Sequence, residues 1–331
     1  MAKIKIAING FGRIGRLTCR ELLNNRNVEV VAINDLTDNQ TLAHLFKYDS
    51  AQGAYSGAVK ATDDHLIIGR KKILATAIKD PSKLPWKKNK VDVVLECTGV
   101  FRSKDKAGLH LKAGAKKVII SAPGQGDGIK TIVLGVNDDK ITSRDKIISN
   151  ASCTTNCLSP LVKVITEKWG LVQGSMTTIH GYTGDQCIQD APHKDLRRAR
   201  AAAVNIIPTS TGAAKAVTKV IDGIDGKLFA MAVRVPVITG SLVELNVIIG
   251  KDVTTQQVNN TFKRYANKEL KGILQYVEDP IVSADIIGNR HSSIFDAGLT
   301  KVSGRLIKVV SWYDNEAGFS ARLAELATKV K

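Results

Sequence analysis

A glycine-rich turn close to the N-terminus restricts the fold of this chain more than any other feature. The apolar run Lys3–Asn9 is followed at once by a G-x-G-x-x-G pattern made of Gly10, Gly12 and Gly15, and an amphipathic segment comes after it. In such a strand-to-helix turn, the first glycine permits the tight bend, the second lets the backbone approach a pyrophosphate, and the third lets the helix pack close to the sheet. The turn therefore predicts a dinucleotide site, with the pyrophosphate at the helix N-terminus.

An acidic residue at a set distance from the glycines supports this interpretation. Glycines in such a turn can serve the backbone conformation alone, but Asp35 stands twenty residues after Gly15, directly behind a second apolar run, Val28–Asn34. A carboxylate there accepts hydrogen bonds from the adenosine ribose and repels a 2′-phosphate. We therefore expect NAD, rather than NADP, as the cofactor.

The hydrophobic pattern divides the chain into two domains. Early in the chain, continuous apolar runs alternate with helical or loop stretches, which is typical of parallel strands buried on both faces. These runs are Lys3–Asn9, Val28–Asn34, Val91–Cys97, Lys117–Ser121, Thr131–Val136 and Lys146–Ser149. Beyond about Trp169, polar and apolar residues alternate, as in Ser241–Val247, which fits antiparallel strands. The predicted fold class is α/β: a Rossmann-type parallel sheet over residues 1–150, an α+β domain with a mainly antiparallel sheet over 151–315, and an amphipathic C-terminal helix, 316–331, that returns to the first domain.

Charge and cysteine content limit the functions of the chain. The 331 residues include 48 Lys+Arg and 31 Asp+Glu, a net charge of +17, yet the basic residues are dispersed and form no long basic arm. A basic surface that attracts anionic substrates is therefore favoured over nucleic-acid binding as a main role. Five cysteines, an odd and sparse set, argue against a secreted disulfide framework. Without an apolar run of about 18 residues or a leader-like N-terminus, we expect a cytoplasmic protein that does not span a membrane.

A cysteine-containing segment lies where the hydrophobic pattern changes. Ser149–Cys157 comes just ahead of Leu158–Trp169, whose apolar spacing is helical, so Cys153 is predicted at or near a helix N-terminus. The positive end of the helix dipole would lower the pKa of the thiol and favour a nucleophilic thiolate. Pro160 complicates this helix, because a proline so far inside predicts either a kink or a later start. Cys157 is expected to pack as a small apolar group, and no metal site is predicted because no further Cys or His ligand lies nearby.

A thiolate nucleophile needs a base, and His180 is the best placed of the six histidines. It stands near the end of an apolar strand, within Thr177–Thr183, and a long polar loop follows. A single histidine is more often structural than catalytic, but the strand end and the preceding cysteine segment favour a catalytic role here. The remaining histidines are expected to be surface or packing residues: His44, His65, His110, His193 and His291.

Four segments, in order, make the chain resemble the phosphorylating glyceraldehyde-3-phosphate dehydrogenases. They are Asn9–Arg16, Ala151–Cys157, Asn205–Val217 and Ser311–Glu316. The cysteine segment alone is highly specific, and the resemblance extends over nearly the whole length. It implies a Rossmann NAD-binding domain, a catalytic domain, a homotetramer, and a glycolytic reaction of glyceraldehyde 3-phosphate with inorganic phosphate.

By position, the resemblance also implies a role for each site residue. Cys153 would be the nucleophile and His180 the residue that activates it, while Asn315 would hold the nicotinamide carboxamide. The other residues implied in NAD binding are Gly10, Gly12, Arg13, Ile14, Gly15, Asp35, Lys79 and Ser121. Those implied in binding the substrate phosphate are Thr183 and Arg234, and those implied in binding inorganic phosphate are Ser152, Thr154, Thr211 and Gly212. One of Arg197, Arg198 and Arg200 would reach an anion, and we choose Arg198.

Some of these assignments have purely structural alternatives. Arg234 is a charge inside an apolar strand, where a planar guanidinium suits a phosphate, but a structural salt bridge would also satisfy it. Thr211-Gly212 precedes an Ala-rich helical run and could bind an anion or simply cap the helix. The chain also departs from the family pattern, because Lys79 replaces a common arginine and Gly181 replaces a Ser or Ala. The lysine would lose the planar stacking of a guanidinium at the adenine end of NAD.

The expected reaction is oxidation of an aldehyde by covalent catalysis. The Cys153 thiolate attacks the aldehyde carbon, and His180 takes the hydroxyl proton as hydride leaves for NAD. Phosphate then attacks the thioester and releases 1,3-bisphosphoglycerate, which requires two anion sites. Two alternatives stay open: an erythrose-4-phosphate dehydrogenase, in which water replaces phosphate, and a binding protein that engages RNA or anionic surfaces through its positive charge.

Overall fold

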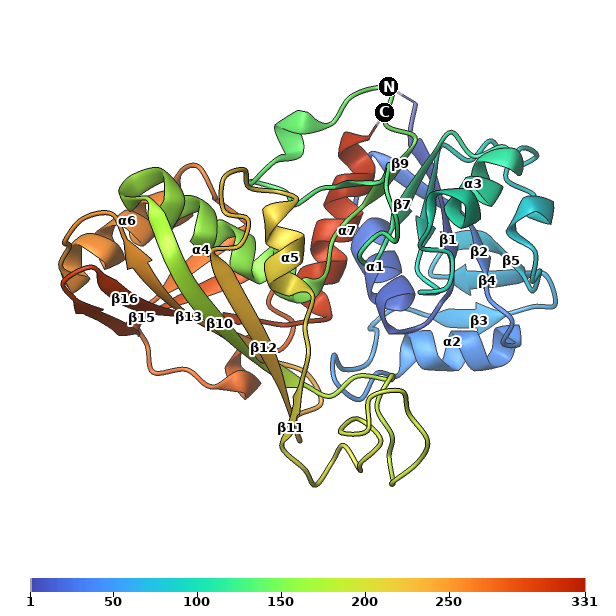
Figure 1. Ribbon diagram of the computed structural model, residues 1–331. Coiled ribbons are helices and arrows are strands. Elements are labelled where there is room, and N and C mark those ends of the chain that lie inside the picture. The colour runs from blue at the N-terminus through green and yellow to red at the C-terminus, as the bar shows by residue number, and fades with distance from the viewer. Residues whose placement is uncertain (1, 331) are drawn as a thin grey trace. The chain divides into compact units, whose positions relative to one another are not determined.

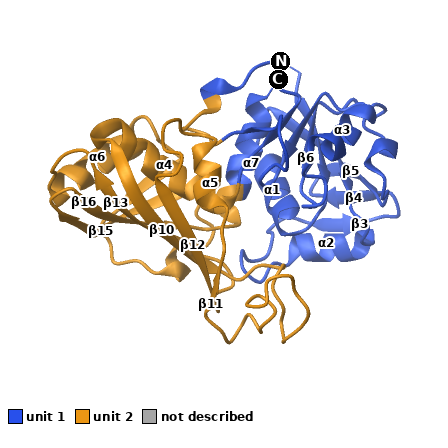
Figure 2. Cartoon of the chain, viewed as in Figure 1, with its two compact units in different colours: residues 1–132, 139–151, 320–331 blue, residues 133–138, 152–319 orange. Residues whose placement is uncertain are grey.

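The chain folds into two compact units (Figures 1 and 2). The computed structural model describes residues 2–330, so Met1 and Lys331, which the expected domain limits include, lie outside the described residues. Within that range, unit 1 comprises residues 2–132, 139–151 and 320–330, and unit 2 comprises residues 133–138 and 152–319. No helix in residues 2–330 combines the length and the apolar character needed to cross a membrane.

Unit 1 is built on a nine-stranded sheet, counted over the described residues, in the order β3-β4-β5-β2-β1-β6-β7-β9-β8. Its parallel strands are β1 (Ile4–Asn9), β2 (Val28–Asn34), β5 (Lys71–Thr76), β6 (Val93–Glu96), β7 (Lys117–Ile120), β8 (Lys130–Thr131) and β9 (Ile147–Ser149). β3 (Val59–Ala61) and β4 (His65–Ile68) add an antiparallel edge. No prediction covered β3, β4 and β5, because they are short and their lysines interrupt the apolar runs.

The register of the parallel strands gathers polar residues at one edge of the sheet. Asn9 lies opposite Asn34 of β2 and opposite Glu96 of β6, so the carboxyl ends of three strands coincide. The residues just before these ends are apolar and fully buried, which keeps the strands in the core. Helices in this unit are α1 (Arg13–Leu23), α2 (Asn39–Lys47), α3 (Lys104–Lys112) and most of α7 (Ala317–Lys329). Short 3-10 helices occur at η1 (Pro81–Lys83) and η2 (Asp138–Lys140).

The prediction of a strand over Thr131–Val136 is wrong beyond its first residue. Only Lys130–Thr131 pairs in the sheet. The apolar residues that follow form a turn, because the Asn137 side chain accepts a hydrogen bond of 2.8 Å from the backbone N–H of Val133 and Gly135 has a φ of +79°. Burial alone, and not pairing in the sheet, explains why this segment is apolar.

Unit 2 contains a seven-stranded mixed sheet, in the order β11-β12-β10-β13-β16-β15-β14 over the described residues. Its strands are β10 (Leu171–Gly181), β11 (Ile207–Thr209), β12 (Leu228–Val235), β13 (Ser241–Ile249), β14 (Leu274–Val277), β15 (Ser293–Ser303) and β16 (Leu306–Tyr313). Its helices are α4 (Cys153–Trp169), α5 (Ala213–Thr218), α6 (Thr255–Asn267) and the 3-10 helix η3 (Ser283–Ile286). The alternation seen in the sequence of β13 matches an alternation of buried and half-buried residues, because α4 packs on one face of the sheet.

Helix α4 begins earlier than its apolar spacing suggested. Ser152 is the N-cap, its hydroxyl accepting a hydrogen bond of 3.1 Å from the backbone N–H of Thr155, and the helix starts at Cys153. The prediction that Cys153 lies at a helix N-terminus is therefore confirmed. The later start that Pro160 suggested is wrong, because the helix continues through this proline to Trp169.

Candidate active site

The glycines of unit 1 form a tight cradle at the start of α1. Gly10 has a φ of +89°, and a Cβ there would stand 2.7 Å from the backbone nitrogen of Thr98. A Cβ on Gly15 would lie 2.1 Å from the carbonyl oxygen of Gly10, so no larger residue fits between strand and helix. Above Gly12, in contrast, nothing lies within 4 Å of an added Cβ. The backbone is thus closed on the protein side and open on the side where a pyrophosphate would approach.

A pocket of about 430 Å³ lies beside this cradle. Asp35 and Lys79 are on its wall, and the carboxylate of Asp35 accepts a hydrogen bond of 2.7 Å from the backbone N–H of Phe11. Its volume, its open glycine backbone and its acidic group fit a dinucleotide. Arg13 turns to Asp49, with 2.5 Å between guanidinium and carboxylate, and Ile14, next to it in α1, is partly buried. Ser121 directly follows β7, where its N–H donates to the carbonyl of Glu96.

In unit 2, the structure brings the predicted nucleophile and base together. The Sγ atom of Cys153 lies 3.5 Å from Nε2 of His180. The other ring nitrogen, Nδ1, lies 2.6 Å from the carbonyl oxygen of Gly181. The guanidinium of Arg234, which can only donate, also lies 3.2 Å from Nδ1, but it has the Gly181 carbonyl and the Thr183 hydroxyl as acceptors. The shorter contact to a carbonyl, which can only accept, therefore assigns the imidazole proton to Nδ1, so that Nε2 presents a lone pair to the thiol.

The charge states of this pair differ from the prediction. Burial raises the pKa of the Cys153 thiol, although the charge of Arg234 and hydrogen bonds at the start of α4 act in the opposite direction. The net shift is opposite to the expected lowering of this pKa, because desolvation of the thiolate outweighs the hydrogen bonds at the start of α4. Burial and the charge of Arg234 lower the pKa of His180 from 6.5 to about 3. The resting pair is therefore a neutral thiol facing a neutral imidazole.

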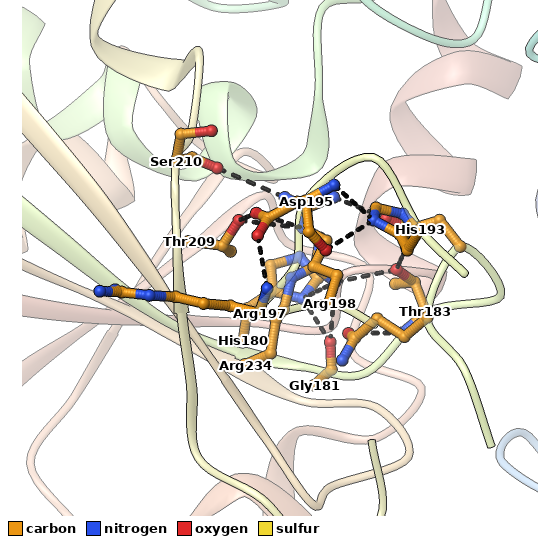
Figure 3. A network of polar contacts seen from close by, with 12 residues as sticks. His180, Gly181, Thr183, His193, Asp195, Arg197, Arg198, Thr209, Ser210 and Arg234 are labelled. Carbon is orange, nitrogen blue, oxygen red and sulfur yellow. Dashed lines mark hydrogen bonds and ion pairs between the residues drawn. The ribbon is translucent and has the colours of Figure 1, made fainter. Parts of the chain in front are cut away.

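Two arginines and a carboxylate surround this pair (Figure 3). Parallel pairing of β10 with β12 places Arg234 opposite His180, and its Nη1 lies 2.9 Å from the hydroxyl of Thr183. Thr183 in turn donates to Asp185, whose second oxygen lies 2.6 Å from Nη1 of Arg198. Nearby Arg234 and Arg198 and the Thr183 hydroxyl hold the pKa of Asp185 below its ordinary value, although burial raises it. The structure thus groups Thr183, Arg198 and Arg234 near the base, and Arg198 also lies 3.8 Å from a second carboxylate, that of Asp195.

The choice of Arg198 among three candidate arginines agrees with this geometry. Its guanidinium also lies 3.0 Å from the hydroxyl of Thr209, and the side chain is only 19% exposed. Arg197 extends away from the network (Figure 3). Arg200 instead pairs with Asp190 in an exposed contact of 2.7 Å.

The four residues implied in binding inorganic phosphate are placed less closely together. Thr154, in the first turn of α4, bonds the hydroxyl of Tyr313 at 2.9 Å, and that ring packs edge-on against His180. Ser152 and Thr211 are each used locally, Ser152 as the N-cap of α4 and Thr211 as an acceptor for the N–H of Ala213 at 3.2 Å. Gly212 is the N-cap of α5, with open space beside it. Within residues 2–330, no hydrogen bond joins Ser152 or Thr211 to His180.

Asn315 is held in one orientation by the chain itself. Its Oδ1 accepts hydrogen bonds from the backbone N–H of Gly240, at 3.2 Å, and from the hydroxyl of Ser241, at 2.9 Å. A backbone N–H can only donate, so these contacts identify the amide oxygen. The NH₂ group is the part of this side chain that remains to donate to a ligand.

Several residues of these sites carried no recognisable sequence signal. In unit 2 they are Thr178, Asp185, Asp195, Thr209 and Tyr313, and in unit 1 they are Asn9, Asn34, Glu96 and Thr98. Most of them lay inside segments that the sequence had singled out, such as Thr178 in Thr177–Thr183 and Tyr313 in Ser311–Glu316, but no role was predicted for any of them. Polar residues at strand ends are common, and which of them meet depends on strand order, which the sequence did not supply.

Comparison with known proteins bears on both units. Residues 4–104 match the family model "Glyceraldehyde 3-phosphate dehydrogenase, NAD binding domain", and residues 152–315 match the model of the C-terminal domain of the same enzyme. The chain belongs to the glyceraldehyde-3-phosphate dehydrogenase family. Relatives of that name include proteins of Mycobacterium tuberculosis (56% identical, covering 99% of this chain and 98% of the relative) and Thermotoga maritima (56%, covering 97% of each). A Mycobacterium leprae protein of the same name is 54% identical over 98% of this chain and 97% of its own length.

Membership of the glyceraldehyde-3-phosphate dehydrogenase family confirms three predictions. The family that the sequence resembles is the right one, the α/β fold class is correct, and NAD is the cofactor of an oxidoreductase. One family model covers the glycine cradle of unit 1, and the other covers the Cys153–His180 pair of unit 2. Membership of the family does not by itself assign a role to any single residue, and the roles proposed below rest on the geometry of the site.

Proposed function

We propose that the protein oxidises glyceraldehyde 3-phosphate with NAD and inorganic phosphate to 1,3-bisphosphoglycerate, through a thioester on Cys153. The observation that carries this proposal is the 3.5 Å contact between Sγ of Cys153 and an unprotonated Nε2 of His180. A thiol with a raised pKa is a poor nucleophile by itself, so a base at this distance is what it needs.

The proton moves between three atoms in the proposed first half-reaction. Nε2 of His180 takes the thiol proton as Sγ attacks the aldehyde carbon, and it returns this proton to the new oxyanion to give a hemithioacetal. Nε2 then takes the hydroxyl proton again while the carbon loses hydride, which leaves a thioester and an imidazolium. In the second half-reaction, phosphate attacks the thioester carbonyl, the thiolate leaves, and the imidazolium returns the proton to it.

NAD supplies the hydride acceptor, and unit 1 offers residues suited to its adenosine diphosphate part. In unit 1, the open backbone at Gly12 would receive the pyrophosphate, Asp35 the adenosine ribose, and Lys79 the adenine end. In unit 2, the free NH₂ group of Asn315 would donate to the carboxamide oxygen. Arg13, Ile14 and Ser121 complete the proposed set.

Two anion sites follow from a substrate phosphate and an attacking phosphate. Arg234, Arg198 and Thr183 would bind the substrate phosphate, because a guanidinium can donate to two phosphate oxygens at once and Nε of Arg234 is buried without a hydrogen-bond partner among the described residues. Ser152, Thr154, Thr211 and Gly212 would bind inorganic phosphate. The hydroxyl of Thr211 accepts one local hydrogen bond, and its own proton can still be donated to an anion.

Omission of phosphate tests the thioester directly. We expect a burst of NADH of roughly one equivalent per active subunit and then slow turnover, because acylation can proceed while deacylation lacks its nucleophile. Arsenate should restore turnover. Thr211→Ala should keep the burst and weaken phosphate about tenfold to a hundredfold, since a hydrogen bond to a charged group contributes about 1.5–3 kcal/mol. Steady turnover without phosphate would instead indicate hydrolysis, as in an erythrose-4-phosphate dehydrogenase.

We also propose a homotetramer. Apolar side chains are unusually exposed on one face of β12, where Phe229 is 73% exposed, and on the loop that follows β10, where Ile188 is 89% exposed. Patches of this kind mark protein–protein interfaces. Sedimentation velocity should give a tetramer for the native protein and a smaller species for Phe229→Asp. A native monomer would contradict the proposal.

A further inference from the structure

A buried carboxylate lies under the dinucleotide pocket of unit 1. Glu96 is the last residue of β6 and is 1% exposed. Its Oε2 accepts hydrogen bonds from Nδ2 of Asn9, at 2.6 Å, and from Nε2 of His110, at 2.9 Å. Its Oε1 accepts from the backbone N–H of Thr98, at 2.8 Å, and from the hydroxyl of the same residue. One carboxylate thus receives four donors in the interior of the protein.

The direction of each hydrogen bond can be assigned. The indole N–H of Trp86 can only donate, and it lies 3.0 Å from Nδ1 of His110. The imidazole proton is therefore on Nε2, where it is donated to Glu96. Because all four groups around Glu96 donate, only a charged carboxylate can accept from all of them. An amide in its place would direct its NH₂ group, which is a donor, toward at least one N–H that is also a donor.

These contacts connect the two walls of the pocket. On one side, Oδ1 of Asn9 accepts a hydrogen bond of 2.8 Å from Nδ2 of Asn34. The side chain of Asn34 also accepts from the backbone N–H of Ile78, at 2.8 Å, and donates to the backbone carbonyl of Ile78, at 3.0 Å. On the other side, the hydroxyl of Thr98 accepts from the N–H of Val100 at 3.1 Å. Ile78 lines one wall beside Lys79, and Thr98 and Val100 line the other. The sheet backbone joins the two sides as well, where the N–H of Cys97 donates to the carbonyl of Asn9 at 2.7 Å, and the carboxylate of Glu96 is the side-chain group that both chains of hydrogen bonds share.

We propose that Glu96 is a positioning residue that sets the spacing of the two pocket walls and thereby the affinity for NAD. This inference rests on the proposed function, because it takes this pocket to be the NAD site. Without the carboxylate, the two walls sample other spacings. The apparent Kd for NAD then rises in inverse proportion to the fraction of molecules whose walls have the spacing that NAD requires. The catalytic pair belongs to unit 2, so chemistry on bound substrate is left unchanged.

The first test compares Glu96→Gln with a packing control. In the orientation with the fewest conflicts, the new NH₂ group faces the N–H of Thr98, so this wall should detach. We expect the Kd for NAD, from calorimetry, and the KM for NAD to rise at least tenfold. The kcat at saturating NAD and the KM for the aldehyde should stay within twofold, and the amides of Thr98 and Val100 should exchange faster. Trp86→Phe, in the same buried cluster, keeps all four donors and should leave the Kd within twofold.

A second pair of variants covers the case in which Glu96→Gln does not fold. Thr98 is exposed, so Thr98→Ala should fold. This variant should raise the Kd for NAD at least threefold. Thr98→Ser, which keeps the hydroxyl, should leave the Kd unchanged. In the folded double variant, the effects should be less than additive, because both changes break one contact. An unchanged Kd in Glu96→Gln or Thr98→Ala, additive effects, or an equal rise in Trp86→Phe would overturn the inference. Failure of the native protein to bind NAD would instead overturn the proposed function.

Discussion

Removal of the Arg234 guanidinium should change the titration of both members of the catalytic pair. Nη1 of Arg234 lies 3.2 Å from Nδ1 of His180, and its charge lowers the pKa of both the imidazole and the Cys153 thiol. In Arg234→Leu, the thiolate loses an attractive charge and the imidazolium loses a repulsive one. The pKa of both groups should therefore rise.

The size of the effect on the thiol can be estimated from the contacts. The chain of contacts through the imidazole places the guanidinium within about 9 Å of Sγ, where two unit charges interact by about 2 kcal/mol at an effective dielectric constant of about 20. At that distance this corresponds to about 1.4 pKa units, and we expect a shift of about one unit, because solvent reaches part of Arg234 and screens its charge. Below the thiol pKa, the thiolate fraction and the rate of alkylation should fall about tenfold.

The assay is the pH dependence of alkylation by iodoacetamide in the absence of phosphate, with Cys153 followed by peptide mass spectrometry because four other cysteines are present. Arg197→Leu is the matched control, since it removes the same charge from a side chain that extends away from the network. A profile for Arg234→Leu that coincides with that of the native protein, or an equal shift in Arg197→Leu, would refute the electrostatic argument.

Three further predictions concern single residues. Cys153→Ser should abolish dehydrogenase turnover and leave NAD binding nearly intact. Cys157→Ser, which replaces a buried sulfur 3.8 Å from a serine hydroxyl, should reduce turnover far less. Turnover of Cys153→Ser within tenfold of that of the native protein would contradict this prediction. Asp35→Gly should narrow the preference for NAD over NADP in steady-state kinetics, and equal use of both by the native protein would show that Asp35 does not contact the ribose. The pKa of His180 is about 3 in the folded protein, against an ordinary value of 6.5. The neutral imidazole therefore contributes fully to the free energy of unfolding above pH 6.5. This contribution is lost as the pH falls toward 3, by up to about 1.4 kcal/mol per pH unit. Urea unfolding at pH 7 and pH 5 should show a smaller difference for His180→Gln than for the native protein, and equal differences would contradict the assignment.

Local chemistry explains which parts of the fold were predictable. In the G-x-G-x-x-G turn, each glycine had a predicted physical role. The structure confirms the roles of Gly10 and Gly15, where neighbouring backbone atoms leave no room for a Cβ. Cys153 was placed at a helix start because the helical apolar spacing of Leu158–Trp169 follows it, and in the structure Ser152 caps α4 at this point. Signals of this kind act over a few residues and need no knowledge of the rest of the chain.

The polar networks could not be predicted, because they depend on strand order and burial. Asn9 and Glu96 are 87 residues apart, and Thr154 and Tyr313 are 159 apart, yet each pair shares a buried hydrogen bond. The raised pKa of Cys153 was missed for the same reason. The position of a helix dipole can be read from sequence, whereas the desolvation that outweighs it depends on every element packed around the thiol.

The resting state of the pair follows from these opposed shifts. A thiol whose pKa is raised and an imidazole whose pKa is lowered to about 3 hold the proton on sulfur, so the charged thiolate–imidazolium form is unfavourable until something compensates it. Arg234 stabilises the thiolate but lies in direct contact with the imidazole, which it keeps from charging. An anion bound to Arg234 would weaken that repulsion and make His180 a stronger base. The same anion would also weaken the attraction between Arg234 and the thiolate, but the guanidinium contacts the imidazole directly and reaches Sγ only across the ring, so the gain in basicity is the larger effect. If Arg234 binds the substrate phosphate, as proposed, transfer of the proton from Cys153 to His180 would be favoured when the phosphorylated aldehyde is in place.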